Sequence, residues 1–220
     1  MTQRITPLSR QTSILLVCDL QEKFRPVIKY FAQIVETSNK LLQACKLLDV
    51  PFVVTEQYPK GLGRTVSELD IGDTKPFEKT LFSMCTPDVM FNIKEQVKDF
   101  NTAIICGIEA HVCVLQTTID LLSQGYRVYV VVDAVSSRSL TDRYLYELIF
   151  SNEIKQRCFR IYAFDHLRQA GAFLTTFESI VLQLAQDANH PNFKQIQQLI
   201  KTSAADTGLL PSHNMPNSSL

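Results

Sequence analysis

Short apolar runs alternate with longer segments of helical periodicity along most of this chain of 220 residues. Two of the runs are "SILLVCD" (13–19) and "RVYVVVD" (127–133). A strand with one face in water alternates polar and apolar residues, so a continuous run indicates a strand that is covered on both faces. Because helical segments follow these strands, the pattern predicts the α/β class, with a parallel sheet flanked by helices.

Periodicity and turn-forming residues also predict where the elements lie. The expected strands are residues 13–19, 52–55, 102–107, 127–133 and 172–176. The expected helices are residues 31–49, 86–100, 112–124, 177–187 and 192–203. The helix over 86–100 opens with Thr86 as an N-cap and Pro87 at the first helical position. Residues 58–65 are expected to form a loop, and residues 137–171 to be mostly helical.

The length of the chain predicts one domain. Hydrophobic residues make up 45% of it, which is enough for one sizeable core. We expect residues 13–203 to form this domain, after an N-terminal extension over 1–12. Residues 204–220 are small and polar, and are expected to be a disordered tail.

The charge pattern argues against nucleic acid and membrane surfaces as partners. Lysine and arginine together number 22, as do aspartate and glutamate, so the formal net charge is zero, and like charges form no long run. No apolar run is long enough to span a membrane. Six cysteines without a C-x-x-C pair suit the reducing cytosol. The start of the chain has two arginines and no acid, so a mitochondrial location stays open.

A cysteine, Cys113, lies where an expected strand gives way to an expected helix. The pKa of a thiol falls at a helix N-terminus and beside a cation, which turns the thiol into a nucleophile. Asp19 at a strand end could act as its base, and Lys79 could supply the cation. From spacing alone each residue has an ordinary alternative, since Asp19 could cap a helix, Lys79 could lie in solvent and Cys113 could be structural.

Four motifs in order make the choice more specific: "LLVCDLQEKF", "VVTEQYPKGLG", "FEKTLFSMC" and "GIEAHVCVLQTTIDLL". Together they resemble the isochorismatase-like cysteine hydrolase family, most closely its animal isochorismatase domain-containing members. The similarity runs from about Ser13 to Leu210. It implies a Rossmann-like three-layer sandwich and a catalytic triad that falls on Asp19, Lys79 and Cys113.

The resemblance also implies a mechanism. A non-proline cis peptide would join Ile108 to Glu109, and the backbone N–H groups of Glu109 and Cys113 would form an oxyanion hole. Asp19 would take the thiol proton, and the thiolate would attack an amide-like carbonyl of a small molecule to give a thioester that water hydrolyses. The family implies a homodimer or larger homo-oligomer. No metal or organic cofactor is expected, because the stretch "TEQYPKGLG" lacks the histidines of the metal site in related nicotinamidases.

Four residues are candidate substrate contacts. Gln21, Phe24 and Tyr58 lie in the motifs that flank the triad, and His111 is two residues from Cys113. Each could instead serve packing or loop structure.

Two other functions are compatible with the sequence. The chain could be catalytically silent and act as a protein-interaction module, or it could split a vinyl ether, a reaction that needs an acid and not a nucleophile. One segment departs from the family, because residues 144–161 look inserted before the expected strand at 172–176.

Overall fold

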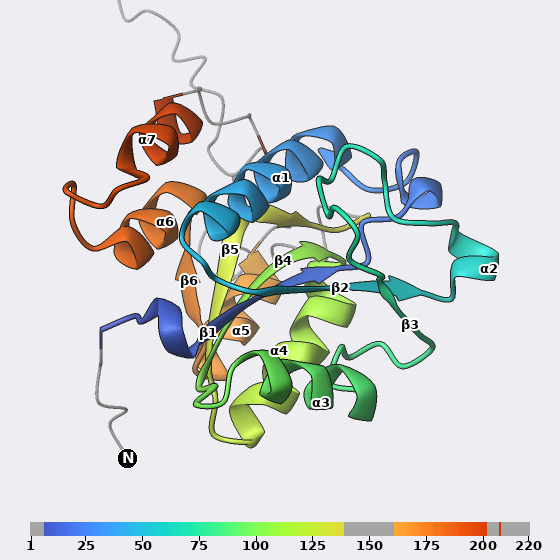
Figure 1. The fold of residues 1–220 in the computed structure, drawn as a ribbon. Helices are drawn as coiled ribbons and strands as arrows, with labels where there is room; N and C mark the ends of the chain where they lie inside the picture. The colour runs from blue at the N-terminus through green and yellow to red at the C-terminus, as the bar shows by residue number, and fades with distance from the viewer. Residues whose placement is uncertain (1–6, 139–160, 202–206, 208–220) are drawn as a thin grey trace, which may run out of the picture.

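The computed structural model describes residues 7–138, 161–201 and 207, which form a three-layer α/β sandwich (Figure 1). Its six-stranded sheet has the order β3-β2-β1-β4-β5-β6, and all neighbouring strands are parallel. The strands are β1 (Ser13–Cys18), β2 (Phe52–Gln57), β3 (Phe77–Lys79), β4 (Thr102–Ile108), β5 (Arg127–Ser136) and β6 (Phe173–Thr175). The predicted fold class is confirmed.

Helices cover both faces of the sheet. They are α1 (Phe31–Leu47), α2 (Pro59–Leu62), α3 (Pro87–Gln96), α4 (Leu115–Ser123), α5 (Ile161–Gln169), α6 (Phe177–Ala185) and α7 (Phe193–Lys201). Short 3₁₀ helices lie at Arg10–Thr12 and Glu22–Phe24, and a π-helical turn at Ala110–Val114 precedes α4. Helices α1 and α6 pack on one face, with α7 against them, and α3, α4 and α5 lie on the other (Figure 1).

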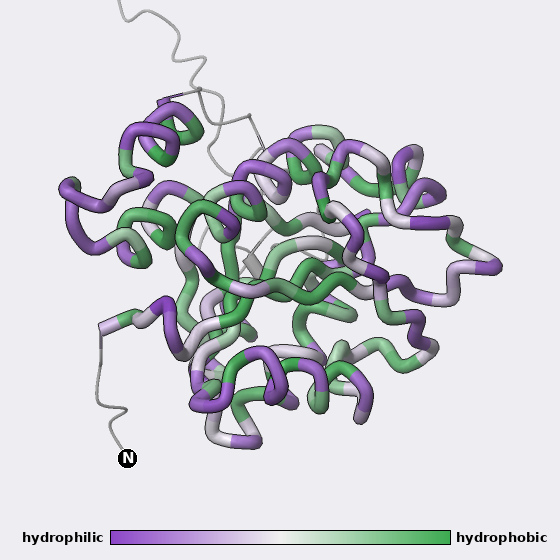
Figure 2. Tube along the Cα trace, in the orientation of Figure 1, coloured by the Kyte–Doolittle hydropathy of each residue, from purple (hydrophilic) through white to green (hydrophobic). Residues whose placement is uncertain are grey.

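The sheet separates two apolar cores. Alternate residues of β1 enter different cores, because Leu15 and Val17 pack under α1 while Ile14 and Leu16 face α3 and α4. All four side chains are essentially without solvent exposure. The apolar colour therefore concentrates along the inner strands, and the hydrophilic colour along the outer sides of the helices (Figure 2). Burial on both faces explains why the strand sequences are continuous apolar runs.

The strand order reverses between β1 and β4, which is the place where open parallel sheets usually bind ligands. In an open parallel sheet the chain leaves two such strands in opposite directions, which opens a crevice at their C-terminal ends. Asp19 directly follows β1, and the segment from Ile108 to Cys113 ends β4 and continues into the π-helical turn. The topology thus carries residues that are far apart in sequence to one place.

Several element boundaries differ from the prediction. Strand β3 was not predicted, because three residues are too few to show a period. The expected loop over 58–65 contains the single turn α2, which Pro59 begins at the first helical position. Strand β5 continues to Ser136, past the acid at position 133, and its register with β4 shifts between Ile105 and Gly107. The start of α3 is confirmed, since the Thr86 side chain accepts a hydrogen bond from the backbone of the third helical residue.

The predicted insertion over 144–161 and the predicted tail over 204–220 lie outside the described residues, apart from Ile161 and Thr207. The described part of the expected N-terminal extension includes Leu8, whose side chain is buried in the core under α1. Within the ranges that the structure describes, no helix combines the length and the apolar character needed to cross a membrane.

Asp133 gives the first prediction. Its carboxylate accepts the backbone N–H of Phe177, the first residue of α6, at 2.9 and 3.2 Å, while burial raises its pKa. Asp133→Asn keeps an acceptor and removes the buried charge, whereas Asp133→Ala leaves that N–H without its acceptor, at a cost of about 1–3 kcal/mol. In urea unfolding at pH 7 we expect Asp133→Asn to be at least as stable as the wild type, and Asp133→Ala to be less stable than both.

The pH dependence checks the cause. A carboxyl group with a raised folded-state pKa stabilises the protein at low pH and loses that contribution as pH rises through the folded-state pKa. The advantage of Asp133→Asn over wild type should therefore be larger at pH 7 than near pH 4. An advantage that is equal at both values would contradict the buried-charge explanation.

Candidate active site at the reversal of strand order

Asp19 directly follows β1, next to the reversal of strand order, and is 1% exposed. Its φ of 51° is left-handed, a conformation that aspartate tolerates better than most residues, and it turns the chain sharply away from β1. One carboxylate oxygen, Oδ1, accepts the hydroxyl of Thr55 at 2.7 Å. The other, Oδ2, accepts the ammonium of Lys79 at 2.7 Å. Both oxygens of Asp19 are thus oriented by neighbours on β2 and β3.

Lys79 is the last residue of β3 and is 5% exposed as a residue. Besides Asp19, its Nζ lies 2.7 Å from Oε1 of Gln57, and 3.2 and 3.0 Å from the carbonyl oxygens of Leu81 and Phe82. Burial by itself lowers the pKa of a lysine, but the negative charge that faces Lys79 outweighs burial, so its pKa is raised. The structure therefore holds a protonated ammonium beside the Asp19 carboxylate.

Cys113 completes the group from the opposite side of the crevice. Its sulfur and a carboxylate oxygen of Asp19 lie within 4.8 Å of each other, and the residue is 7% exposed. It lies in the π-helical turn over 110–114, a conformation that is rare in general and frequent at functional sites. The structure thus brings together Asp19, Lys79 and Cys113, the three residues predicted as a triad.

The backbone before Cys113 has the cis peptide that the family resemblance implies. The peptide between Ile108 and Glu109 is cis. Glu109 precedes the helix, and its carbonyl accepts the first i→i+5 bond, from the N–H of Val114 at 3.2 Å. The N–H of Cys113 comes before that bond in the chain, at the end of the helix where backbone donors point outward. The N–H groups of Glu109 and Cys113 are the proposed oxyanion hole.

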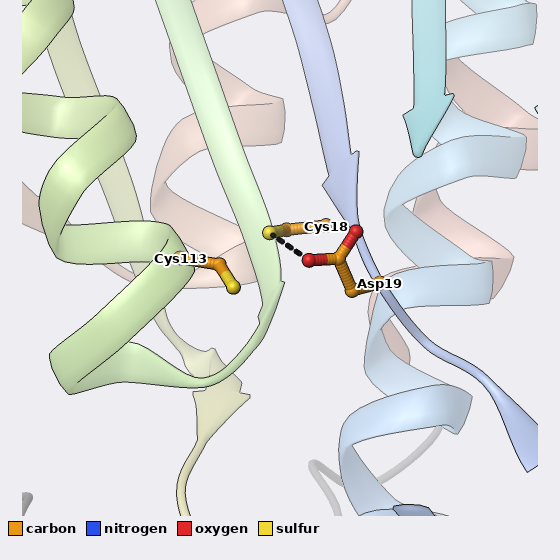
Figure 3. A group of neighbouring side chains, drawn as sticks. All are labelled: Cys18, Asp19 and Cys113. Atoms are coloured by element: carbon orange, nitrogen blue, oxygen red, sulfur yellow. Dashed lines mark hydrogen bonds between the residues drawn. The ribbon is translucent and has the colours of Figure 1, made fainter. Parts of the chain in front are cut away.

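Cys18 is a neighbour that the sequence analysis did not assign to the site. Figure 3 shows its side chain pointing toward Cys113, beside Asp19. The Cys18 thiol lies 3.5 Å from Oδ2 of Asp19. Burial raises the pKa of Cys18 well above the usual range of a thiol, and nearby negative groups raise it further. Cys18 is therefore a protonated thiol in the resting site.

The sequence analysis also did not assign Thr55, Gln57 and Thr117 to the site. The hydroxyl of Thr117 donates to the carbonyl of Cys113 at 2.6 Å and accepts the backbone N–H of Met84 at 2.8 Å, so it joins the helix of the nucleophile to the loop after Lys79. Thr55 and Gln57 carry a recognisable signal, since they are polar residues at the C-terminal end of an apolar strand. Thr117 carries none, because it lies on a helix among other buried residues.

Gln21 is buried, and its side chain forms hydrogen bonds with backbone groups. Its Oε1 accepts the N–H of Gln57 at 2.8 Å, and its Nε2 donates to the carbonyls of Gln57 and Gly63 at 3.0 and 2.7 Å. These bonds fasten the segment after β1 to the end of β2. We therefore assign Gln21 to the support of the crevice instead of to substrate contact.

The other candidate contacts differ in exposure. Tyr58 is 54% exposed, Phe24 is half-buried against the core, and His111 is half-buried with its Nδ1 3.0 Å from the hydroxyl of Ser137. Tyr58 and His111 have surface that a ligand could meet, so both stay candidates. The ring of Phe24 contributes mainly to packing.

The fold and this cluster can be compared with known proteins. The family model described as "Isochorismatase domain" matches residues 13–179, which is most of the chain. The chain belongs to the isochorismatase family. Its members with curated descriptions include isochorismatase domain-containing protein 2 of Danio rerio, 49% identical over 92% of this chain and 94% of the relative. The human protein of the same description is 46% identical over 95% and 93%.

A solved structure agrees with the family assignment. The structure titled "MAR1 Ribonuclease from Caenorhabditis elegans" is 49% identical, with a TM-score of 0.80, and the match covers 94% of this chain and 98% of that chain. The isochorismatase family fold therefore holds for the whole described sheet. The resemblance inferred from the four sequence motifs is confirmed, and the chain is an isochorismatase-like hydrolase.

Gly107 gives a prediction about the crevice. Its φ is +110°, and a Cβ added there would lie 2.1 Å from the carbonyl oxygen of Cys18, the residue opposite on β1. Gly107→Ala would push apart the two strands that carry the acid and the nucleophile, and we expect a loss of several kcal/mol or no soluble protein. Gly125→Ala is the control, since its φ is +85° with nothing near the added Cβ. Equal losses in urea unfolding would contradict the steric argument.

Thr117 gives a second prediction, with Thr118 as its matched control. Both hydroxyls are buried and bond to the carbonyl four residues earlier, but only Thr117 also accepts the N–H of Met84. Thr117→Val leaves that N–H without its acceptor, which costs about 1–3 kcal/mol. Thr118→Val should cost less in the same urea titration. A larger loss in the Thr118 variant would contradict the role of Thr117 as a link.

Proposed function

We propose that the chain is a cysteine hydrolase that cleaves the C–N bond of a small amide-like molecule, with Asp19, Lys79 and Cys113 as its catalytic triad. One observation carries the proposal. A buried carboxylate touches a buried ammonium at 2.7 Å and lies within 4.8 Å of a cysteine sulfur at the end of the sheet where parallel α/β proteins bind ligands. These are the parts that an activated nucleophile requires.

The first half of the proposed reaction forms a thioester. Asp19 takes the proton of the Cys113 thiol, and the sulfur attacks the carbonyl carbon of the substrate. The negative charge that develops on the carbonyl oxygen is met by the N–H groups of Glu109 and Cys113. The tetrahedral intermediate then breaks its C–N bond as Asp19 returns the proton to the leaving nitrogen. The products of this half are a free amine and a thioester on Cys113.

The second half regenerates the protein. Asp19 accepts a proton from water, and the resulting hydroxide attacks the thioester. The carbon–sulfur bond then breaks as Asp19 returns this proton to the departing sulfur, which releases a carboxylic acid and restores the Cys113 thiol and the Asp19 carboxylate. Lys79 stays protonated throughout and keeps Asp19 oriented by its short bond to Oδ2. Its further bonds to Gln57 and to two backbone carbonyls supply the rigidity that such positioning needs. No metal or organic cofactor takes part in these steps.

The reactivity of Cys113 provides the first test. The protein is treated with iodoacetamide between about pH 5 and 9, and each cysteine peptide is followed by mass spectrometry. Cys113 should react faster than the other cysteines, because Asp19 lies close enough to take the proton of its thiol. Lys79→Met should abolish this advantage, whereas Lys94→Met, a change at an exposed lysine of α3, should not. A Cys113 that reacts no faster than the other cysteines would favour the interaction-module alternative.

Turnover separates the remaining alternatives. An amide hydrolase of this type loses activity in both Cys113→Ala and Asp19→Asn, by roughly 10³-fold or more, as nucleophile and base act as a unit. A vinyl ether hydrolase would keep its activity in Cys113→Ala and lose it in Asp19→Asn. A panel of small amides, an enol ether and a single-stranded RNA should be assayed with the wild type, with Cys113→Ala and with Asp19→Asn. The covalent intermediate should appear as an added acyl mass on the wild-type chain alone.

RNA belongs in that panel for a specific reason. The solved structure from Caenorhabditis elegans, 49% identical to this chain, is called a ribonuclease in its title. An RNA-cleaving activity is therefore the second candidate. The formal net charge of zero does not favour the phosphate contacts that dominate RNA affinity. RNA cleavage that persists in Cys113→Ala and disappears in Asp19→Asn would support this candidate over the amide hydrolase.

We also propose that the chain assembles into a homodimer or larger homo-oligomer. Leu81 and Phe82, whose carbonyls bind Lys79, have side chains that are 53% and 50% exposed, and Phe91 on α3 is 69% exposed. Exposed side chains of this size are common at contacts between subunits. Light scattering coupled to size exclusion should give a mass above one chain, and a monomer at micromolar concentration would contradict the proposal.

A further inference from the structure

We propose that Cys18, Asp19 and Cys113 together form a binding site for a thiophilic divalent metal ion such as zinc, and that the bound ion blocks the nucleophile. The three residues are the one group among the described residues whose potential ligand atoms converge in this way, all within 4.8 Å of one another. Figure 3 shows the two sulfurs and the carboxylate converging on one space between β1 and the helix of Cys113.

The left-handed backbone of Asp19 explains the convergence. Successive side chains of a strand point to opposite faces of the sheet, so Cys18 and Asp19 would ordinarily diverge. The φ of 51° at Asp19 ends the strand and breaks this alternation. Gly107, opposite Cys18, has no Cβ, which lets β1 and β4 lie close enough for Cys113 to reach the same space. The fold thus places a third ligand beside the acid and the nucleophile.

The distances suit tetrahedral zinc. With Zn–S near 2.3 Å and Zn–O near 2.0 Å, a sulfur and an oxygen bound to one ion lie about 3.5 Å apart, and two sulfurs lie about 3.8 Å apart. The Cys18 sulfur is 3.5 Å from Oδ2 of Asp19, and the Cys113 sulfur is within 4.8 Å of both. The site therefore requires at most a small change of side-chain torsion. The fourth position would face the crevice and hold water.

Charge also favours the ion. Two thiolates and one carboxylate carry three negative charges, which a divalent ion and the ammonium of Lys79 balance to zero. A buried site that is neutral overall avoids the large cost of an uncompensated charge. Lys79 need not leave, because an ammonium that bonds to a ligating carboxylate orients it from the outer shell. Thr55 holds the other oxygen of the same carboxylate in the same manner.

Binding must release protons. The thiolate is the form of cysteine that ligates a metal, so coordination by Cys18 and Cys113 replaces their thiol protons with the ion. In the overall step, the divalent ion replaces the protons of the two thiols, and the metal dithiolate forms as these protons are released. No atom is oxidised or reduced. The apparent affinity should therefore rise roughly tenfold per pH unit for each proton released. Thiolate ligands select zinc or cadmium over magnesium or calcium.

The proposed inhibition by the bound ion rests on the proposed function, whereas the proposed binding of the ion does not. An ion at this position occupies the sulfur of Cys113 and an oxygen of Asp19, so neither is available as nucleophile or base. Inhibition by zinc should therefore be complete and reversed by a chelator.

Cadmium is the probe for binding. The tag-free protein, reduced with a phosphine, is titrated with Cd²⁺ while the ultraviolet absorbance of cadmium–thiolate bonds is followed. We expect one ion per chain. Cys18→Ser should weaken binding by more than the roughly 10–100-fold that loss of an outer-shell partner costs. Cys45→Ser, at a buried cysteine of α1 outside the cluster, should leave binding unchanged.

The outcomes separate the two proposals. Equal cadmium affinity in wild type and Cys18→Ser overturns the metal site, even if amide hydrolysis is found. Tight binding that depends on Cys18 in a protein without hydrolase activity supports the metal site and removes the proposed function. If Cys18→Ser does not fold by circular dichroism, Cys113→Ala serves as the second ligand variant, and unchanged binding there likewise overturns the site.

Discussion

The buried ion pair between Asp19 and Lys79 is the interaction on which the arrangement of the crevice depends. Both side chains are nearly without solvent exposure, and two charges in such a place are costly unless each is fully bonded. The surroundings meet this demand with the hydroxyl of Thr55, the amide of Gln57 and two backbone carbonyls. The pair therefore dictates the conformation of the ends of β1, β2 and β3 together. Loss of either partner would leave the other charge buried alone.

Cys113 is held by different means. Cys113 makes no ion pair with this network, and its position comes from the turn after β4 and from the hydroxyl of Thr117. The same hydroxyl reaches the backbone of Met84 in the loop beyond Lys79. The two halves of the crevice are thus joined at a second point, away from the charges. This arrangement lets Asp19 and Cys113 keep their spacing without a direct bond between their side chains.

The sequence predicted the α/β class and most of its elements because burial on both faces leaves an unambiguous apolar pattern. It did not predict β3, because a half-buried phenylalanine, an exposed glutamate and a buried lysine form no apolar run. The convergence of Asp19, Lys79 and Cys113 could be predicted from the ordered motifs and not from spacing, since Asp19 and Lys79 meet across 60 positions of sequence. Thr117 and Cys18 could not be predicted, because each reads as an ordinary buried residue until the partner strand or loop is in place.

Lys79 lies at the end of β3, an edge strand of only three residues, and this has a consequence for motion. Strand β3 pairs with β2 through Thr55, Glu56 and Gln57 alone and has no neighbour on its other side among the described residues. Edge segments with few backbone bonds open at lower free energy than the strands in the middle of a sheet. The ammonium of Lys79 acts as an anchor for this edge, since it holds β3 to β1 through Asp19. Local opening of the sheet edge and loss of the charge pair are therefore a single event, and amide hydrogen exchange along β3 reports directly on the integrity of the crevice.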